Sequence, residues 1–381
     1  MWITLASDHA GGRRSKSRGE ITLRPFAVLV VPILVSVASC EERPAEVPSP
    51  PFEEVFELAE VIVLGEGPSD SVAEVGEFFE RRDGGFIIAD RLLPRVRTYR
   101  EDGSLEAGFG RFGDGPWEFR TIRGVAEVAD GRIAVTGAQN GAVTYLNPDL
   151  TPHSMLLIED FTSSMLLPFG RDLVFTGRAR DVNLVAEMDG IFHRLIDSAV
   201  TWSSWNTPAA SKPYWNALGG LHGAAAGDSV YVMAGLLYPA TILSAAGDSV
   251  GSIGTPSPDF RRVPELEPGA LAFAGGAGAA AQAGTGLKTL IESFDLVTGL
   301  DIVDDYLVFT VGRHDPAKPW FPFKQLDVFV EAYDRHTGEK LFENVPLPEG
   351  SKVLGGGRYL YVLVNPEFPP WRIARYKLRI P

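Results

Sequence analysis

The sequence has a single cysteine among its 381 residues, which excludes an intramolecular disulfide framework. Its six histidines include no pair with zinc-protease spacing, and the glycine-rich stretch Gly110–Phe119 lacks the Lys-Ser/Thr of a P-loop. These absences argue against a zinc protease and against a P-loop nucleotide-binding enzyme. The glycines instead suit a tight passage between structural units, with Trp117 and Phe119 packed there.

Positive charge is also scarce. The chain has 35 Lys and Arg against 49 Asp and Glu, a formal net charge of −14 at pH 7. A surface of this sign repels phosphate backbones, so we expect no nucleic-acid partner. The same acidity also serves solubility.

The apolar run at residues 26–39, "FAVLVVPILVSVAS", is only fourteen residues long, which suits a signal-peptide core better than a membrane span. Small residues follow it, and then the single cysteine, Cys40. The sequence Val37-Ala38-Ser39-Cys40 resembles the lipobox of bacterial lipoproteins, with Val37 where Leu is more common. The resemblance implies cleavage before Cys40 and lipidation of its thiol.

Residues 40–53 are rich in Pro and Glu and show no periodicity, which predicts an extended tether after the lipidated Cys40. By resemblance to lipoproteins of Gram-negative bacteria, Glu41 after the cysteine favours the outer membrane, with the domain facing the periplasm. We therefore expect a signal peptide at 1–39, a tether at 40–53 and one folded domain at 54–381.

Glycine and proline are abundant, at 41 and 28 residues, which favours many short strands joined by turns over long helices. The clearest unit spans residues 121–157, where strand-like segments alternate with Asp-Gly, Asn-Gly and Pro-Asp turns. This is the pattern of one blade of a β-propeller. Similar units are expected at 75–103, 163–198, 219–254, 296–348 and from 352 onward.

The unit from 352 onward has room for only three strands, whereas Phe56–Leu64 is a strand-like segment with no neighbour in sequence. We expect Phe56–Leu64 to pair as the outer strand of that last unit, which closes the ring and hides exposed edges. The sequence thus predicts an all-β, six-bladed propeller, with seven blades as the alternative.

Two stretches, 85–103 and 110–150, resemble the repeats of NHL-type and TolB-like six-bladed propellers. Asp90 matches a position where the family often has Asp, whereas Gly137 departs from it, and later units match only by pattern. Related propellers serve as scaffolds, sensors and, less often, enzymes. Residues 255–295 do not resemble a blade and are expected to be an insertion.

Two clusters of aromatic residues in Pro- and Asn-rich loops are candidates for ligand binding, although the alternative is that their rings fill the gaps between blades. Flat rings suit a sugar or an apolar peptide side chain, and an arginine would anchor an anionic group. The candidate ligand-binding residues are Trp202, Trp205, Tyr214, Trp215, Arg313, His314 and Trp320.

Histidines from different blades can converge on a channel metal, as in propeller lyases of this general resemblance. His222 is expected on an inner strand, and His314 is expected to end another inner strand. Asp304, with Asp301 and Asp305, could supply an acidic partner, although the Asp-x-x-Asp-Asp spacing also reads as a turn. A metal-assisted lyase or hydrolase at the channel mouth is therefore an alternative function, with Ca or Zn as the metal to consider.

The leading hypothesis is a non-catalytic, monomeric propeller, held to the membrane through a lipid on Cys40. It would bind an envelope protein, peptide or glycan. No cofactor is required by the sequence, and the identity of any metal stays open. A purely structural envelope component, with a flat apolar face and no deep pocket, is the third alternative.

Overall fold

The computed structural model describes residues 49–65, 70–137, 142–157, 161–179, 190–196, 199–203, 221–263, 292–315, 326–364 and 369–379. At 161–164, 175–179, 190–196 and 199–203 only the backbone is described. The signal peptide, Cys40 and the first part of the expected tether therefore lie outside the described residues.

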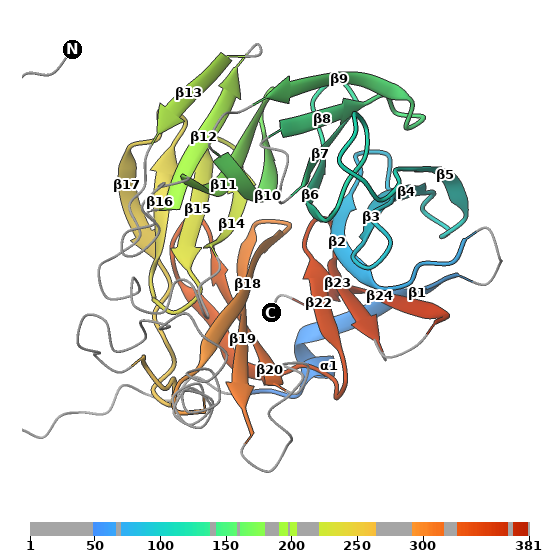
Figure 1. Ribbon diagram of the computed structural model, residues 1–381. Coiled ribbons are helices and arrows are strands. Elements are labelled where there is room, and N and C mark those ends of the chain that lie inside the picture. The colour runs from blue at the N-terminus through green and yellow to red at the C-terminus, as the bar shows by residue number, and fades with distance from the viewer. Residues whose placement is uncertain are drawn as a thin grey trace, which may run out of the picture. The chain divides into compact units, whose positions relative to one another are not determined.

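The described residues form six four-stranded antiparallel sheets, which are taken here in chain order (Figure 1). The first holds β2 (Val75–Glu80), β3 (Phe86–Asp90), β4 (Val96–Tyr99) and β5 (Leu105–Phe109). The second holds β6 (Ile122–Glu127), β7 (Ile133–Gly137), β8 (Ala142–Leu146) and β9 (Pro152–Leu157). The third holds β10 (Phe161–Phe169), β11 (Asp172–Ala179), β12 (Gly190–Ile196) and β13 (Ala199–Ser203).

The remaining sheets repeat this arrangement. The fourth holds β14 (Leu221–Ala226), β15 (Ser229–Ala234), β16 (Ala240–Ser244) and β17 (Ser249–Ile253). The fifth holds β18 (Leu296–Val303), β19 (Tyr306–His314), β20 (Leu326–Asp334) and β21 (Lys340–Pro346). The sixth holds β22 (Lys352–Gly355), β23 (Leu360–Val364), β24 (Trp371–Leu378) and the N-terminal β1 (Phe56–Leu64).

Asp-Gly and related turns join the strands, as the sequence predicts. Asp102, Asp130 and Asp149 each accept a hydrogen bond from the backbone N–H two residues later, at 2.9, 3.1 and 3.0 Å. This contact is the local turn that Asp side chains favour. Gly103 and Gly131 have φ of 84° and 86°, which only glycine adopts without strain. Turn chemistry therefore sets where these strands end.

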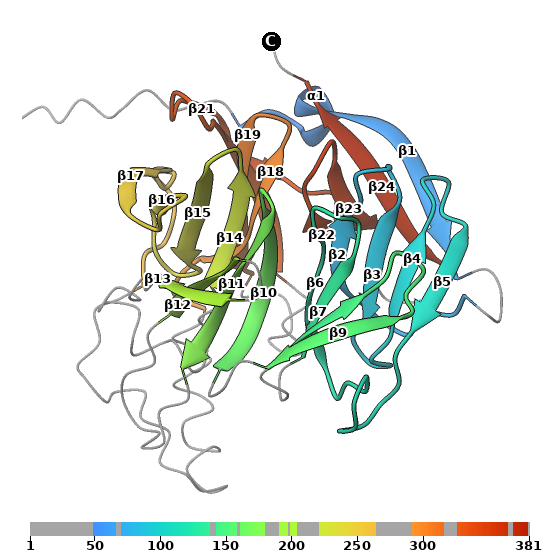
Figure 2. The same ribbon diagram turned by 90° about the horizontal axis from the view of Figure 1, so that it is seen from above.

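The fold is an all-β propeller. In each sheet the first strand of the unit lies innermost, and Figure 2 shows the other strands following outward, for example from β14 to β17. Each inner strand contacts the next inner strand along the chain, and β22 contacts β2. Trp117 and Phe119 pack in a core cluster that joins the first sheet to the second, as expected.

The predicted pairing of the N-terminal strand is confirmed. β1 runs antiparallel to β24, from Phe56 opposite Leu378 to Leu64 opposite Trp371. Because β1 comes from the start of the domain and β24 from its end, this sheet joins the two ends of the domain. The edge of β24 is thereby covered.

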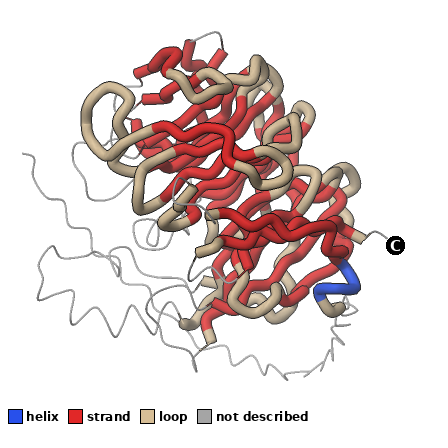
Figure 3. The backbone as a smooth tube through the Cα atoms, turned by 90° about the vertical axis from the view of Figure 1, so that its right-hand side faces the viewer, coloured by secondary structure: helices blue, strands red, loops and turns tan. Residues whose placement is uncertain are grey.

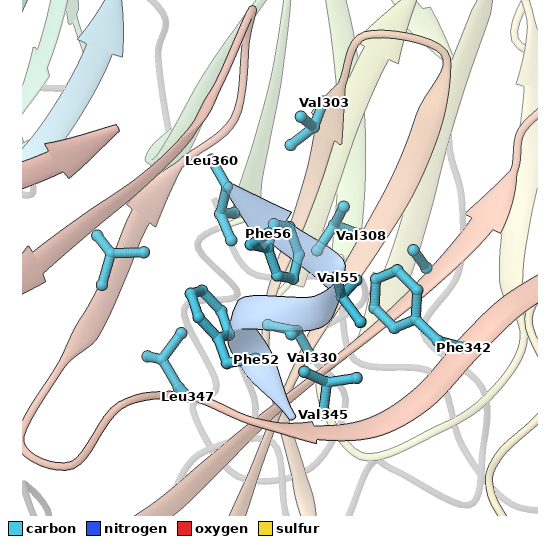
Figure 4. Packing of buried hydrophobic residues seen from close by; sticks show 12 residues of the cluster. Phe52, Val55, Phe56, Val303, Val308, Val330, Phe342, Val345, Leu347 and Leu360 are labelled. Carbon is cyan, nitrogen blue, oxygen red and sulfur yellow. The ribbon is translucent and has the colours of Figure 1, made fainter. Parts of the chain in front are cut away.

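A folded element begins inside the stretch 40–53 that was expected to be a tether. A four-residue helix, α1 (Phe52–Val55), precedes β1 (Figure 3). It is the only α-helix in the described part of the chain. Phe52 is buried and stacks on Phe56 with ring centroids 4.6 Å apart. Figure 4 shows both rings within the apolar cluster between the fifth and sixth sheets. Apolar burial thus places Phe52 in the domain core.

The third unit is longer than predicted, from 161 to 203 rather than 163 to 198. Its outer strand β13 contains Trp202, which pairs with His193 of β12, so the loop predicted at Trp202 is wrong. The expected insertion at 255–295 is irregular over 255–263 and 292–295, and its centre lies outside the described residues. Within the described residues, no helix is both long and apolar enough to span a membrane.

Candidate functional site: the central cavity

A cavity of about 2200 Å³ is lined by residues of all six inner strands. Its walls combine apolar side chains, such as Phe78 and Met165, with ionisable groups that face it from separate strands. Such a cavity is larger than the usual small-ligand pocket. The purely structural envelope component was expected to have no deep pocket, and that expectation is wrong.

Glu77 of β2 is the first ionisable group of the cavity wall, and it was not anticipated from the sequence. Its side chain is half-buried, and this burial raises the pKa of its carboxyl to about 7. The positive charges of Lys352, Arg123 and Arg91 oppose that rise. Glu77 can therefore hold or release a proton near neutral pH.

Asp301 of β18 is the second such group. Its carboxyl accepts a hydrogen bond from the backbone N–H of Gly356, at 3.1 Å. Burial raises its pKa to about 6, and the Gly356 hydrogen bond acts in the opposite direction. The sequence predicted a turn at 301–305, but Val303 pairs with Tyr306, so the turn holds only Asp304 and Asp305. Asp301 therefore lies within the strand.

The two residues of that turn differ in their surroundings. Asp304 has φ of 53° and lies at the cavity wall. Asp305 is exposed and forms an ion pair with Arg335 at 2.6 Å. Hydrogen bonds from Arg335 and His336 lower the pKa of Asp305. Only Asp301 and Asp304 of the predicted acidic cluster thus reach the cavity.

His222 lies on the inner strand β14 and lines the cavity, as predicted. Burial lowers the pKa of its imidazole to about 4, against a hydrogen bond to the backbone of Val297. The ring is therefore neutral at physiological pH and is held between β14 and β18.

His314 does not join His222. It ends β19, the second strand of its sheet rather than an inner strand, and it is absent from the described cavity wall. Its ring is buried with Nε2 3.8 Å from Glu292. The described part of the chain contains no group of three His, Cys, Asp or Glu residues able to hold a metal ion. The predicted convergence of His222 and His314 is not found.

Arg313 belongs to a network at the base of the expected insertion. Its guanidinium lies 3.0 Å from Asp259 and 3.1 Å from the fully buried Asp295. Asp295 also pairs with Arg261, at 2.7 Å. Arg313 was expected to anchor an anionic ligand, which would have to compete with these two carboxylates.

The aromatic candidates fall largely outside the described residues. These are Trp205, Tyr214, Trp215 and Trp320. Trp202 has a described backbone in β13 but no described side chain. Their predicted contacts with a ligand stay predictions.

The segment Gly247–Gly251, "GDSVG", matches the Gly-x-Ser-x-Gly pattern of serine hydrolases. In those enzymes the serine lies on a sharp turn between a strand and a helix. Here Ser249 begins β17, the outermost strand of its sheet, after the turn that follows β16. The surroundings of Ser249 therefore do not match a nucleophile elbow.

Comparison with known proteins supports the fold. Neither a family model nor a curated protein matches the chain. A Bacteroides vulgatus protein of the DUF4221 family is similar in structure, with a TM-score of 0.57 and 12% identity, over 86% of this chain and 99% of that one. A Bacteroides fragilis protein described as exported has a TM-score of 0.55 and 12% identity, over 88% of this chain and 98% of that one.

A virginiamycin B lyase from Staphylococcus aureus is more distant. Its TM-score is 0.45 at 10% identity, over 85% of this chain and 100% of that one. The two Bacteroides proteins, at 12% identity, show a shared fold alone.

Proposed function

We propose that this chain is a lipid-anchored, six-bladed propeller of the bacterial envelope, related to NHL-type and TolB-like propellers. It binds a peptide, protein or glycan without changing it chemically. The central cavity is the binding site. The observation that carries this proposal is a deep cavity with partly buried carboxyls, Glu77 and Asp301, supplied by separate sheets.

The count of six blades is supported by the six four-stranded sheets and by the contact between β22 and β2. A seventh blade would need a further sheet built from residues outside those described. The pairing of β1 with β24 favours six, because it joins the two ends of the domain within one sheet.

Placement in the envelope rests on the apolar run at 26–39 and the lipobox-like residues ending at Cys40. The similar fold of a Bacteroides protein described as exported agrees with it. The lipid would hold the domain at the outer membrane, on the periplasmic side. Cleavage before Cys40 and acylation of its thiol would appear as a mass shift of the mature N-terminal peptide.

Binding is favoured over lyase chemistry because His222 and His314 do not share a site. The ionisable groups of the cavity suit the recognition of polar groups on a ligand. The aromatic residues Trp202, Trp205, Tyr214, Trp215 and Trp320 are proposed to extend this site by stacking on the ligand.

The test is a binding screen with soluble peptides and glycans released from bacterial envelopes, followed by two tryptophan variants. Lys352→Trp places a large ring at the cavity wall, whereas Arg372→Trp places it on the exposed part of β24. We expect Lys352→Trp to weaken binding at least about tenfold, because it occupies the ligand's space, and Arg372→Trp to leave it unchanged. Equal binding by both variants would contradict a site in the cavity.

A further inference from the structure

The strongest unexplained feature of the cavity is a small polar recess on β18, around Gly299. Gly299 pairs with Thr310 of β19, and both residues line the cavity. A Cβ atom at Gly299 would lie 3.2 Å from Thr310 Oγ1 and 3.5 Å from Asp301 Oδ2. The Thr310 hydroxyl and a carboxylate oxygen of Asp301 therefore both border the place that a side chain at Gly299 would occupy.

The Thr310 hydroxyl has no hydrogen-bond partner among the described residues, although its side chain is only 4% exposed. A buried hydroxyl without a partner costs about 1–3 kcal/mol, so it calls for an explanation. The position of this hydroxyl next to Gly299 offers an explanation. A ligand group bound in the recess could form the missing hydrogen bond with the Thr310 hydroxyl.

The Asp301 carboxylate is also incompletely satisfied. The backbone N–H of Gly356 donates a hydrogen bond to its Oδ1. No ion pair to Asp301 is found within the described part of the chain. Lys352, the lysine of the cavity wall, acts on Glu77 instead. Asp301 is half-buried, and carboxylates that are removed from water are normally paired with a cation.

Resting on the proposed ligand-binding role of the cavity, we propose that Gly299, Asp301 and Thr310 form a subsite for a protonated primary amine. Oδ2 of Asp301 and Oγ1 of Thr310 accept two of its three N–H donors. Gly299 admits the amine because it has no Cβ. Gly356 acts as a positioning residue that fixes the carboxylate. The ligand class is then a molecule with an alkylammonium end, such as a polyamine or a lysine-like side chain.

A second Gly–Thr pair, on β6 and β7, provides a comparison for the pair formed by Gly299 and Thr310. Gly124 of β6 pairs with Thr136, whose hydroxyl is likewise buried and without a described partner. There, however, a Cβ would meet the backbone N of Leu166 at 3.0 Å, so the next sheet fills the space. Thr136 is absent from the described cavity wall, and the atoms nearest to a Cβ at Gly124 belong to Leu166 and Thr136 rather than to a carboxylate. Thr136 therefore provides a matched control.

The experiment titrates the full chain with 1,5-diaminopentane at pH 7.5 and, separately, with 1,5-pentanediol, which has the same length but no charge. Calorimetry or thermal shift is the readout. We expect the diamine to bind and the diol to bind at least about tenfold more weakly. Equal binding of diol and diamine, or no binding of the diamine, would overturn the amine subsite.

Four variants locate the binding. Asp301→Asn keeps the shape of the side chain, and Gly299→Ala covers the recess; each should weaken diamine binding about tenfold or more. Asp305→Asn removes one negative charge from the adjacent turn, and Thr136→Val removes the matched hydroxyl; both should bind within about twofold of the wild type. If Asp301→Asn and Asp305→Asn weaken binding equally, the effect is general charge attraction and the subsite is wrong.

Folding of each variant is checked by circular dichroism. Because Gly299→Ala and Asp301→Asn perturb the recess in different ways, a folding defect in one leaves the other as the test. Failure of the diamine to bind, together with successful blocking by Lys352→Trp of an envelope ligand, would reject the amine subsite alone. Failure of both would reject the binding role of the cavity.

Discussion

At the scale of single residues, the cavity is defined by carboxyl groups that are costly to ionise. Glu77 and Asp301 are held by separate sheets, and burial raises both of their pKa values. Burying a carboxyl group at each of these two positions lowers the free energy of unfolding relative to burying an apolar side chain there. That cost is consistent with a role in ligand recognition.

Glu77 should make folding stability depend on pH. In the unfolded chain its pKa is about 4.5, and in the folded protein it is about 7, so the folded state binds the proton more tightly. The stability that this provides is present below pH 4.5 and is lost as pH rises to 7. Glu77→Gln should therefore raise stability at pH 8 by up to about 3 kcal/mol and flatten the pH dependence.

Urea unfolding between pH 5 and pH 8 measures this effect. Glu57→Gln is the control, because the side chain of Glu57 is 61% exposed on β1. An unchanged pH dependence in Glu77→Gln would show that the Glu77 carboxyl is well hydrated.

Asp295 illustrates the opposite case, a buried charge that is fully paired. It is 0% exposed and accepts hydrogen bonds from Arg261 and Arg313. Asp295→Asn leaves two guanidinium groups without their shared partner and should cost about 3 kcal/mol in chemical denaturation. Asp259→Asn, whose carboxylate is 51% exposed, should cost under about 1 kcal/mol. Equal losses would mean that Asp295 is not the centre of this network.

At the scale of elements, strands and turns follow local rules that the sequence displays. The Asp-Gly turns and the buried strand Phe86–Asp90 were predictable because turn chemistry and short apolar runs are local signals. The pairing of Phe56–Leu64 with the last sheet is not local, and it was predictable because the last unit was one strand short. The role of Glu77 in the cavity wall was not predictable, because Glu77 looks like one polar residue of an ordinary strand. Its significance depends on strands far apart in sequence meeting at the centre. Asp301 was misread because the turn is two residues long rather than five.

The closing strand β1 should contribute strongly to stability. Phe56 is 2% exposed and contacts Phe52 and Phe342, with ring centroids 4.6 and 5.7 Å away. Phe56→Ala removes this packing and should cost about 3–5 kcal/mol in guanidinium unfolding. Glu57→Ala, on the exposed side of the same strand, should change it by under about 0.5 kcal/mol. A loss below about 1 kcal/mol for Phe56→Ala would mean that β1 contributes little to closure.

At the scale of the whole molecule, the propeller brings six inner strands around one cavity, so that each sheet supplies different chemistry to a shared space. β14 contributes a neutral imidazole, β2 and β18 contribute carboxyls, and β22 contributes a lysine. The fold is shared with proteins that are only 12% identical in sequence. If the chain binds a ligand as proposed, its own cavity residues rather than its architecture would therefore select that ligand.

The most direct test of the central claim, that ligands bind in the cavity, is methyl NMR of the five methionines. Met165 lies at the cavity wall on β10, whereas Met155 lies on the outer strand β9 and Met233 is buried within its sheet. Adding peptides and glycans released from bacterial envelopes should shift the Met165 signal and leave Met155 unchanged, and Lys352→Trp should abolish the shift. A shift at Met155 without one at Met165 would place binding on the outer surface and contradict a cavity site.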